Sequence, residues 1–154
     1  MREAVFAYIG LGANLGQPRE AVLAAMEAIA DIDGLALLRK SSLYGSAPID
    51  AGGADYVNAV VQVQTRLKPH ALLALLQGIE HTAGRMRPFR NAPRTLDLDL
   101  LLYDHVVLND AELLLPHPRM WQRAFVLRPL AEIAPTLVSA AQLQAVAEQA
   151  VWLL

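Results

Sequence analysis

The stretch Arg94-Thr95-Leu96-Asp97-Leu98-Asp99-Leu100-Leu101-Leu102 organises this chain, because it alternates acidic and apolar residues and then becomes wholly apolar. We expect a strand over 93–103. Side chains alternate along a strand, so Asp97 and Asp99 share one face while the leucines between them can enter a core on the other. Two carboxylates about 7 Å apart on a strand can hold a pair of hard divalent cations. An edge strand with polar residues on its open face would have the same pattern.

Arginine is concentrated immediately upstream of the acidic pair, at Arg85, Arg87, Arg90 and Arg94. The planar guanidinium fork matches phosphate oxygens better than the mobile charge of lysine does. Aspartate is disfavoured inside strands, so an acidic pair beside four arginines calls for a functional explanation. The combination predicts metal-assisted phosphoryl chemistry.

Apolar periodicity predicts an alternation of strands and helices along the rest of the chain. We expect strands over 4–11, 35–46 and 56–67 before the one at 93–103, and helices over 18–30 and 69–83. The first strand is apolar on both faces and is expected to be central. This β-α-β-β-α-β order predicts an α+β fold, a ferredoxin-like antiparallel sheet with two helices packed on one face. The remaining segments are predicted as a hairpin partner at 106–107, loops at 48–53 and 85–92, and a C-terminal helical extension with helices at 118–133 and 139–154.

Composition narrows the functional classes. The 154 residues, 55% of them hydrophobic, are expected to form one domain, 1–154, with a substantial core. The absence of cysteine excludes disulfides, thiol catalysis and zinc–thiolate sites. No apolar run reaches the roughly 18 residues of a membrane span. A net charge of −2 does not suggest a broad nucleic-acid surface. This composition fits a cytoplasmic protein without nucleic-acid or membrane partners, and we separately expect it to act on small molecules as a monomer.

Two further motifs bear on nucleotide binding. The pattern Gly10-x-Gly12-x-x-x-Gly16 departs from the dinucleotide fingerprint, because its last spacing is one residue too long, and we expect a tight turn there. No Walker A sequence is present, so a nucleotide would have to be held by arginines and metal.

His117 lies between two prolines and precedes Arg119 and Arg123. It is either an ordinary loop histidine or a contact to a phosphate or nucleobase.

A possible binding surface for a flat ring lies on the strand at 56–67. Tyr56 and Asn58 share one face of that strand, where tyrosine can stack on a ring and asparagine can recognise a donor–acceptor edge. An ordinary half-exposed sheet surface is the alternative. Phe125 could close such a site or simply fill the core.

Several blocks of the sequence resemble the 6-hydroxymethyl-7,8-dihydropterin pyrophosphokinase family. The blocks that carry the resemblance are residues 9–16, 42–44, 55–59, 84–87, 93–99, 116–120 and 123–130. They include Pro93-Arg94-Thr95-Leu96-Asp97-Leu98-Asp99 and Pro116-His117-Pro118-Arg119-Met120, and together they extend over nearly the full chain. The resemblance implies transfer of diphosphate from ATP to the hydroxymethyl group of 6-hydroxymethyl-7,8-dihydropterin, with release of AMP, in folate biosynthesis.

The same resemblance implies roles for individual residues. Asp97 and Asp99 would hold two Mg²⁺ ions and would be catalytic together with Arg85, Arg87 and Arg94. ATP would be contacted by Gln77, Glu80, Arg85, Arg94, Leu100, His117 and Arg123. The pterin would be bound by Ser46, Ala47, Ile49, Tyr56, Asn58 and Phe125, with Tyr56 and Phe125 on either side of its rings. No residue stands out as a general base.

The chain departs from the family pattern at four places, one of which is the loop over 85–92, which is one residue shorter than in some members. Asn91 stands where a tryptophan often occurs, Pro118 stands where an aromatic residue can occur, and Ser46-Ala47 replaces Thr-Pro. None of these changes removes a proposed metal ligand or phosphate contact.

Three other functions stay open from the sequence. A nucleotidyl transferase or cyclase would also use two metal-binding aspartates, but it would release pyrophosphate. An RNA-binding or ligand-sensing module on the same fold would be expected to have paired aromatics and a basic sheet face. A non-catalytic relative would have no need of the retained acids and arginines.

Overall fold

A six-stranded antiparallel sheet forms the centre of the structure, a computed structural model that describes residues 3–48, 53–84 and 96–154. The strands run in the order β5-β1-β4-β3-β8, and β2 also pairs with β4. Their bounds are β1 Val5–Ala13, β2 Leu35–Lys40, β3 Tyr44–Ser46, β4 Tyr56–Thr65, β5 Asp97–Tyr103 and β8 Val151–Leu153. A separate hairpin pairs β6 (Leu108–Asn109) with β7 (Leu114–Leu115).

Strand β1 is central, as its apolar faces predict. It pairs with β4 on one side and with β5 on the other. Its Ile9 is buried in a core on one face of the sheet, and its Tyr8 is buried in a second core on the other. On β5, Leu98 and Leu100 are buried, which confirms that the leucines of the acidic stretch enter a core.

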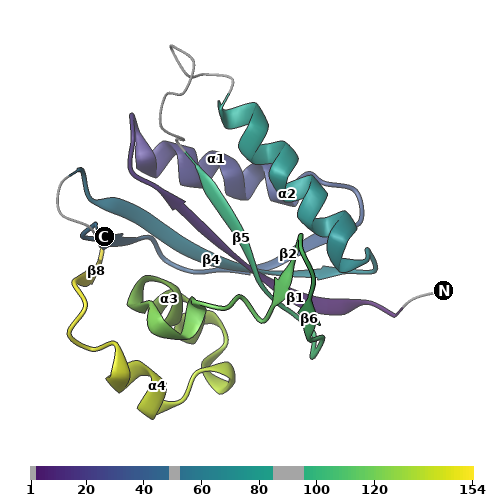
Figure 1. Ribbon diagram of the computed structural model, residues 1–154. Helices are drawn as coiled ribbons and strands as arrows, with labels where there is room; N and C mark the ends of the chain where they lie inside the picture. The colour runs from purple at the N-terminus through teal and green to yellow at the C-terminus, as the bar shows by residue number, and fades with distance from the viewer. Residues whose placement is uncertain (1–2, 49–52, 85–95) are drawn as a thin grey trace.

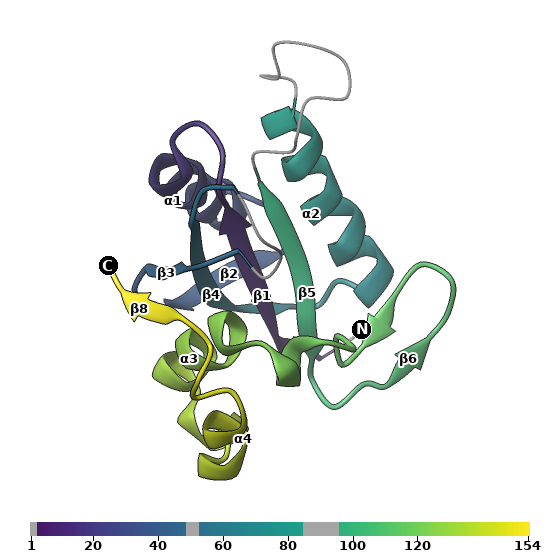
Figure 2. The ribbon, with the colours of Figure 1, turned by 60° about the vertical axis from the view of Figure 1, so that its left-hand side comes forward.

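Helices cover both faces of the sheet (Figures 1 and 2). Helices α1 (Pro18–Ala30) and α2 (Pro69–Gly84) lie on the first face, where Val22 and Leu72 are fully buried. Helix α3 (Ala124–Ile133) covers the other face and is followed by the short α4 (Ala140–Ala145). The predicted antiparallel sheet with packed helices is therefore confirmed. Within the described ranges, no helix is long and apolar enough to cross a membrane.

The single strand predicted over 35–46 is wrong, because the chain forms β2 and β3 with a break between them. At the break, the Ser41 hydroxyl donates to Ser42 O and accepts the N–H of Val60 at 3.0 Å. A serine hydroxyl that bonds to backbone groups in this way takes the place of a backbone hydrogen bond between neighbouring strands. The hairpin partner predicted at 106–107 is also displaced, since β6 begins at Leu108 and Val107 is 78% exposed.

The two predicted C-terminal helices are both shorter than expected. The segment at 118–133 contains a 3₁₀ turn (Met120–Gln122) and then α3, because Arg123 between them is extended, with φ −126° and ψ 113°. The segment predicted as a helix over 139–154 is helical only in α4, and its end forms strand β8. Strand β8 pairs with the edge of β3 that β4 leaves free, since a strand edge offers a row of backbone donors and acceptors.

Strand β8 packs closely on β3 around Gly45. Gly45 pairs with Trp152, and a Cβ atom at Gly45 would lie 2.4 Å from the indole Nε1. Only a glycine leaves room for this indole, so the residue is required by packing.

Glu132, near the end of α3, binds the segment that leads into β3. Its carboxylate accepts the Ser42 N–H at 3.0 Å, the Ser42 hydroxyl at 2.9 Å and the Tyr44 hydroxyl at 2.7 Å. Burial and the hydrogen bond to Glu132 raise the pKa of Tyr44 to about 12. Burial alone would raise the pKa of Glu132, but the hydrogen bonds from Tyr44 and Ser42 outweigh it and lower that pKa.

We predict that Gly45→Ala destabilises the protein by about 1–3 kcal/mol, the usual cost of forcing extra atoms into a packed site. Urea unfolding gives the free energy. Gly78→Ala is the matched control: it lies in α2, where an added Cβ atom would have nothing within 4 Å, and it should stabilise by about 1 kcal/mol because alanine is the better helix former. Equal effects of the two substitutions would contradict the packing role of Gly45.

We also predict a pH-dependent contribution from Glu132. Its pKa is lower in the folded protein than the ordinary value of 4.5, so the unfolded chain binds more protons in the acidic range. The stability difference between wild type and Glu132→Gln should be complete at pH 7 and shrink as the pH falls below 4.5. Urea unfolding at a series of pH values measures it, with exposed Glu148→Gln as the control for charge. A difference that does not vary with pH would contradict the assignment.

Candidate active site

A cavity of about 550 Å³ lies beside the sheet face that α3 covers. Strands β1, β3, β4 and β5 contribute to its lining, and so does the first turn of α3. The cavity therefore brings together residues from four separate segments, within 10–14, 46–60, 97–99 and 119–126.

The acidic pair reaches this cavity from one face of β5. Asp97 is exposed and Asp99 is half-buried, and both line the cavity. Their partners across the ladder on β1 are Gly12 and Gly10, which carry no side chain and leave the acids accessible. Gly12 thus lies inside the strand and not in the predicted tight turn, which is confined to the residues around Gly16, with φ of 62°.

The residues predicted to bind a flat ring line the same cavity, namely Tyr56 and Asn58 from β4, Ser46 and Ala47 at the end of β3, and Phe125 from α3. Ser46 donates its hydroxyl to Asn58 Oδ1 at 2.6 Å, and both residues are buried. Because this bond occupies the amide oxygen, the asparagine keeps its Nδ2 as a donor, next to Gly12. Phe125 lines the cavity and also packs against the second core.

Positive charge enters the cavity from the segment around the 3₁₀ turn. Arg119 and Arg123 both line it, and the Arg123 guanidinium lies 5.5 Å from the centre of the Phe125 ring. Sequence reasoning did not select Arg119 as a site residue, although its position two residues after His117 was a usable signal. Burial is the main cause that lowers the pKa of His117; Asp99 opposes it, and Arg123 and Arg119 add to it. The neutral imidazole is therefore favoured.

A second, smaller cavity of about 300 Å³ lies between β5 and the β6–β7 hairpin. Asp99 borders both cavities, and Leu100 and His117, two of the predicted nucleotide contacts, line the smaller one. The two cavities therefore share Asp99, one member of the acidic pair.

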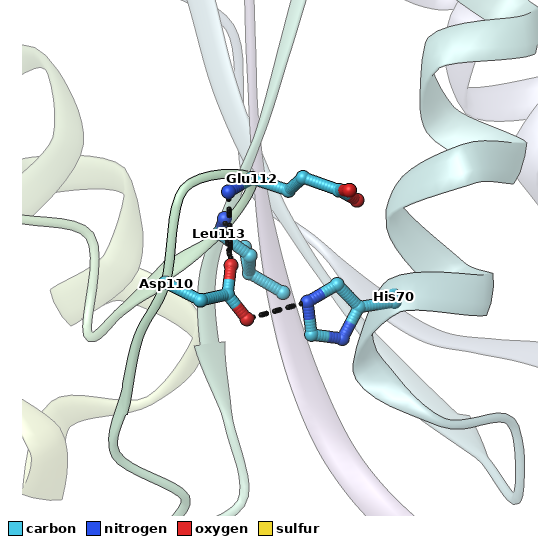
Figure 3. Close-up of polar contacts among 4 residues, drawn as sticks. All are labelled: His70, Asp110, Glu112 and Leu113. Carbon is cyan, nitrogen blue, oxygen red and sulfur yellow. Dashed lines mark hydrogen bonds and ion pairs between the residues drawn. The ribbon is translucent and has the colours of Figure 1, made fainter.

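Asp110 lines the hairpin wall of the smaller cavity, and Figure 3 shows its polar contacts. Its Oδ1 accepts the N–H groups of Glu112 at 2.9 Å and Leu113 at 2.8 Å, and its Oδ2 lies 2.8 Å from His70 Nε2 on α2. The backbone bond from Glu112 is the largest cause that lowers the pKa of Asp110, followed by those from Leu113 and His70. This contact joins the hairpin to the first turn of α2.

Of the remaining predicted contacts, the two that the structure describes, Gln77 and Glu80, line neither cavity. Gln77 is exposed on α2. Glu80 accepts the N–H of Leu98 at 2.8 Å, so it holds the backbone between the two acids. Arg85, Arg87, Arg94 and Ile49 lie outside the described residues. Among the described residues, no group of three or more His, Cys, Asp or Glu could hold a metal ion.

The arrangement suits a polyanionic ligand next to a planar one. Two carboxylates with a histidine and arginines nearby can hold a metal-bound polyphosphate, while Tyr56, Phe125 and the Asn58 amide can hold a flat polar ring. Within the described ranges, the serine that lines the large cavity, Ser46, is hydrogen-bonded to Asn58 and not to a base.

Comparison with known proteins gives consistent matches. The family model for 7,8-dihydro-6-hydroxymethylpterin-pyrophosphokinase matches residues 8–135. The chain is 45% identical to 2-amino-4-hydroxy-6-hydroxymethyldihydropteridine pyrophosphokinase from Haemophilus influenzae, over 87% of this chain and 84% of that protein. It is 46% identical to the enzyme of that name from Pseudomonas aeruginosa, over 84% and 81%.

A likeness to solved structures supports the fold. The crystal structure of Plasmodium falciparum HPPK-DHPS wild type with pteroate matches with a TM-score of 0.67 at 13% sequence identity. The match covers 86% of this chain and 39% of that one, so the present chain corresponds to a part of that larger protein.

We predict that Ser46→Ala destabilises the protein by about 1–3 kcal/mol, because it leaves the buried Asn58 oxygen without its partner. Replacing both residues, as in Ser46→Ala with Asn58→Val, should recover much of this loss, since no orphaned polar group remains. Thermal and urea unfolding of the two variants measure the difference. A double variant that is less stable by the sum of both losses would contradict the pairing.

Proposed function

The chain belongs to the 7,8-dihydro-6-hydroxymethylpterin-pyrophosphokinase family, and on that premise we propose how its cavity performs the reaction. The protein is an enzyme of folate biosynthesis that transfers diphosphate from ATP to the hydroxymethyl group of 6-hydroxymethyl-7,8-dihydropterin and releases AMP. One observation carries the assignment of the site: the acidic pair and the ring-binding residues line one cavity.

The pterin occupies the large cavity in this proposal. Tyr56 and Phe125 lie on either side of its rings, and Asn58 pairs with its amide edge. The Ser46 hydroxyl supports this role, because it orients the amide so that Nδ2 is available as a donor. Backbone groups of Ser46, Ala47 and Ile49 complete the pocket.

ATP binds where the two cavities meet. His117 and Arg123 contact the phosphates, and Leu100 contacts the nucleotide in the smaller cavity. Gln77 and Glu80 are assigned to the nucleotide side, and Glu80 also keeps β5 in place through Leu98. Arg85, Arg87 and Arg94 complete the phosphate site, and one such arginine can be worth about a thousandfold in rate.

The acidic pair fits Mg²⁺. Magnesium in proteins is usually held by one or two carboxylates together with phosphate oxygens and water, and Asp97 and Asp99 supply the carboxylates, with no third acidic group joining them among the described residues. We assign two ions to them. What bound Mg²⁺ supplies is charge neutralisation on the phosphates and alignment of ATP.

The reaction is an in-line displacement. The hydroxymethyl oxygen forms a bond to the β-phosphorus of ATP, the bond between that phosphorus and the oxygen of the α-phosphate breaks, and AMP leaves with that oxygen. The hydroxyl proton is lost to solvent, since no residue is assigned as a general base. Positioning by the two walls of the cavity provides much of the rate.

The order of β5, β1, β4 and β3, with α1 and α2 on one face, supports a ferredoxin-like core. We assign the chain to a single pyrophosphokinase domain, acting as a monomer in the cytoplasm.

The experiment that tests the function is a coupled assay for AMP release from MgATP, with and without 6-hydroxymethyl-7,8-dihydropterin. Pterin-dependent AMP formation is the expected result. Pyrophosphate release would instead indicate nucleotidyl transfer, and ATP binding without turnover would indicate a non-catalytic relative.

We predict that Asp97→Asn and Asp99→Asn each lower kcat/KM by at least about a hundredfold, since charge stabilisation by bound metal is worth several kcal/mol. Asp33→Asn is the matched control, because it makes the same charge change in an exposed turn away from both cavities. Titration with MgCl₂ should require higher concentrations in the two active-site variants. Full turnover by either of them would refute the metal assignment.

A further inference from the structure

The side chain of Gln149 bridges the break between the 3₁₀ turn and α3. Its Oε1 accepts the N–H of Ala124 at 2.8 Å, and its Nε2 donates to the carbonyl of Gln122 at 2.8 Å. A backbone donor and a backbone acceptor fix which end of the amide faces which group, so this orientation of the glutamine is the only one that satisfies both.

These two bonds hold the backbone on either side of Arg123. Arg123 is the N-cap of α3, it is extended, and its side chain does not cap the helix. The first N–H groups of a helix have no partner within the helix. Gln149, 25 residues further along the chain, accepts the first of them, from Ala124. The direction in which Arg123 leaves the backbone, and the start of the helix turn that carries Phe125, thus depend on a distant side chain.

The next residues of the same segment hold the opposite wall of the cavity. The carbonyl of Ala150 accepts the N–H of Ala47 at 3.2 Å, and Val151 pairs with Ser46 across the β3–β8 ladder. The carbonyl of Val151 also accepts a hydrogen bond from Arg128 of α3. Residues 149–151 therefore contact both the α3 wall and the β3 wall of the large cavity.

We propose that Gln149 is a positioning residue, which sets Arg123 and Phe125 at the correct place relative to the β3 wall for binding of pterin and phosphate. This role rests on the proposed function of the cavity. The family model matches residues 8–135. Gln149 lies in the C-terminal segment that follows the matched residues.

The test compares three variants of the full chain. Gln149→Leu keeps the size of the side chain and removes both hydrogen bonds, whereas Gln149→Glu keeps the acceptor for Ala124 and removes the donor for Gln122. Gln144→Leu is the matched control, because Gln144 is exposed in α4 and its side chain makes no hydrogen bond within the described ranges.

Gln149→Leu should raise KM for the pterin and lower kcat/KM by about tenfold, the equivalent of about one net hydrogen bond. Gln149→Glu should also raise KM, because it sets a carboxylate oxygen against the carbonyl of Gln122, and Gln144→Leu should have no effect. Hydrogen exchange of the Ala124 amide should become faster in Gln149→Leu. A merely structural role would lower the melting temperature and the active fraction without changing KM, and that result would overturn the proposal.

A double-mutant cycle with Phe125→Ala gives the decisive comparison. If Gln149 acts by placing Phe125, its substitution should weaken pterin binding much less once Phe125 is absent. The dissociation constant of the pterin is measured by pterin fluorescence. If the effects of the two substitutions are additive, the positioning role is overturned. The proposed function still stands in that case, provided that the wild type is active. A wild type without pterin-dependent AMP release would instead overturn the proposed function, and the positioning role with it.

Discussion

The register of β1 against its two neighbours is the constraint on which the cavity depends. Gly12 pairs with Asn58 on β4 and with Asp97 on β5, so one position of β1 brings the amide and a carboxylate to either side of it. Gly10 stands opposite Asp99 in the same way. Because strand side chains alternate with a period of two, a slip of one residue would turn these groups to the face covered by α1 and α2. The two apolar cores, one on each face, maintain the register.

The other wall of the cavity is held by polar contacts at both ends of α3. Near its C-terminal end, Glu132 binds Ser42 and Tyr44, which lead into β3. At its N-terminus, Gln149 accepts the N–H of Ala124, the first residue of the helix. Between them, the Arg128 guanidinium lies 5.5 Å from the centre of the Tyr44 ring. The helix that carries Phe125 and the strand that carries Ser46 are thus fastened to each other as well as to the sheet, and this favours a preformed pocket for a rigid ring.

Local sequence patterns were reliable where one physical rule dominated. Alternation of leucine and aspartate predicted both the buried and the open face of β5, since the period of a strand is fixed by its backbone geometry. The same rule failed at 35–46, where the Ser41 hydroxyl takes backbone partners that a periodicity argument does not consider. Helical periodicity likewise failed at 139–154, where apolar residues compatible with a helix pair instead with the edge of β3 as strand β8. Arg119 was missed because a single loop arginine has no periodic signal.

The residues by themselves predicted the acidic pair, the central first strand and a ring-binding surface at Tyr56 and Asn58, because each of these depends on residue type and short spacing, and the resemblance of several sequence blocks predicted the family. Only the tertiary structure decided that Ser46 orients Asn58, that Glu80 holds the strand between the two acids and that Gln149 supports the start of α3. Those contacts join residues 12, 18 and 25 positions apart. No local pattern encodes them, because they form only after strand pairing and helix packing have brought distant backbone groups within hydrogen-bonding distance.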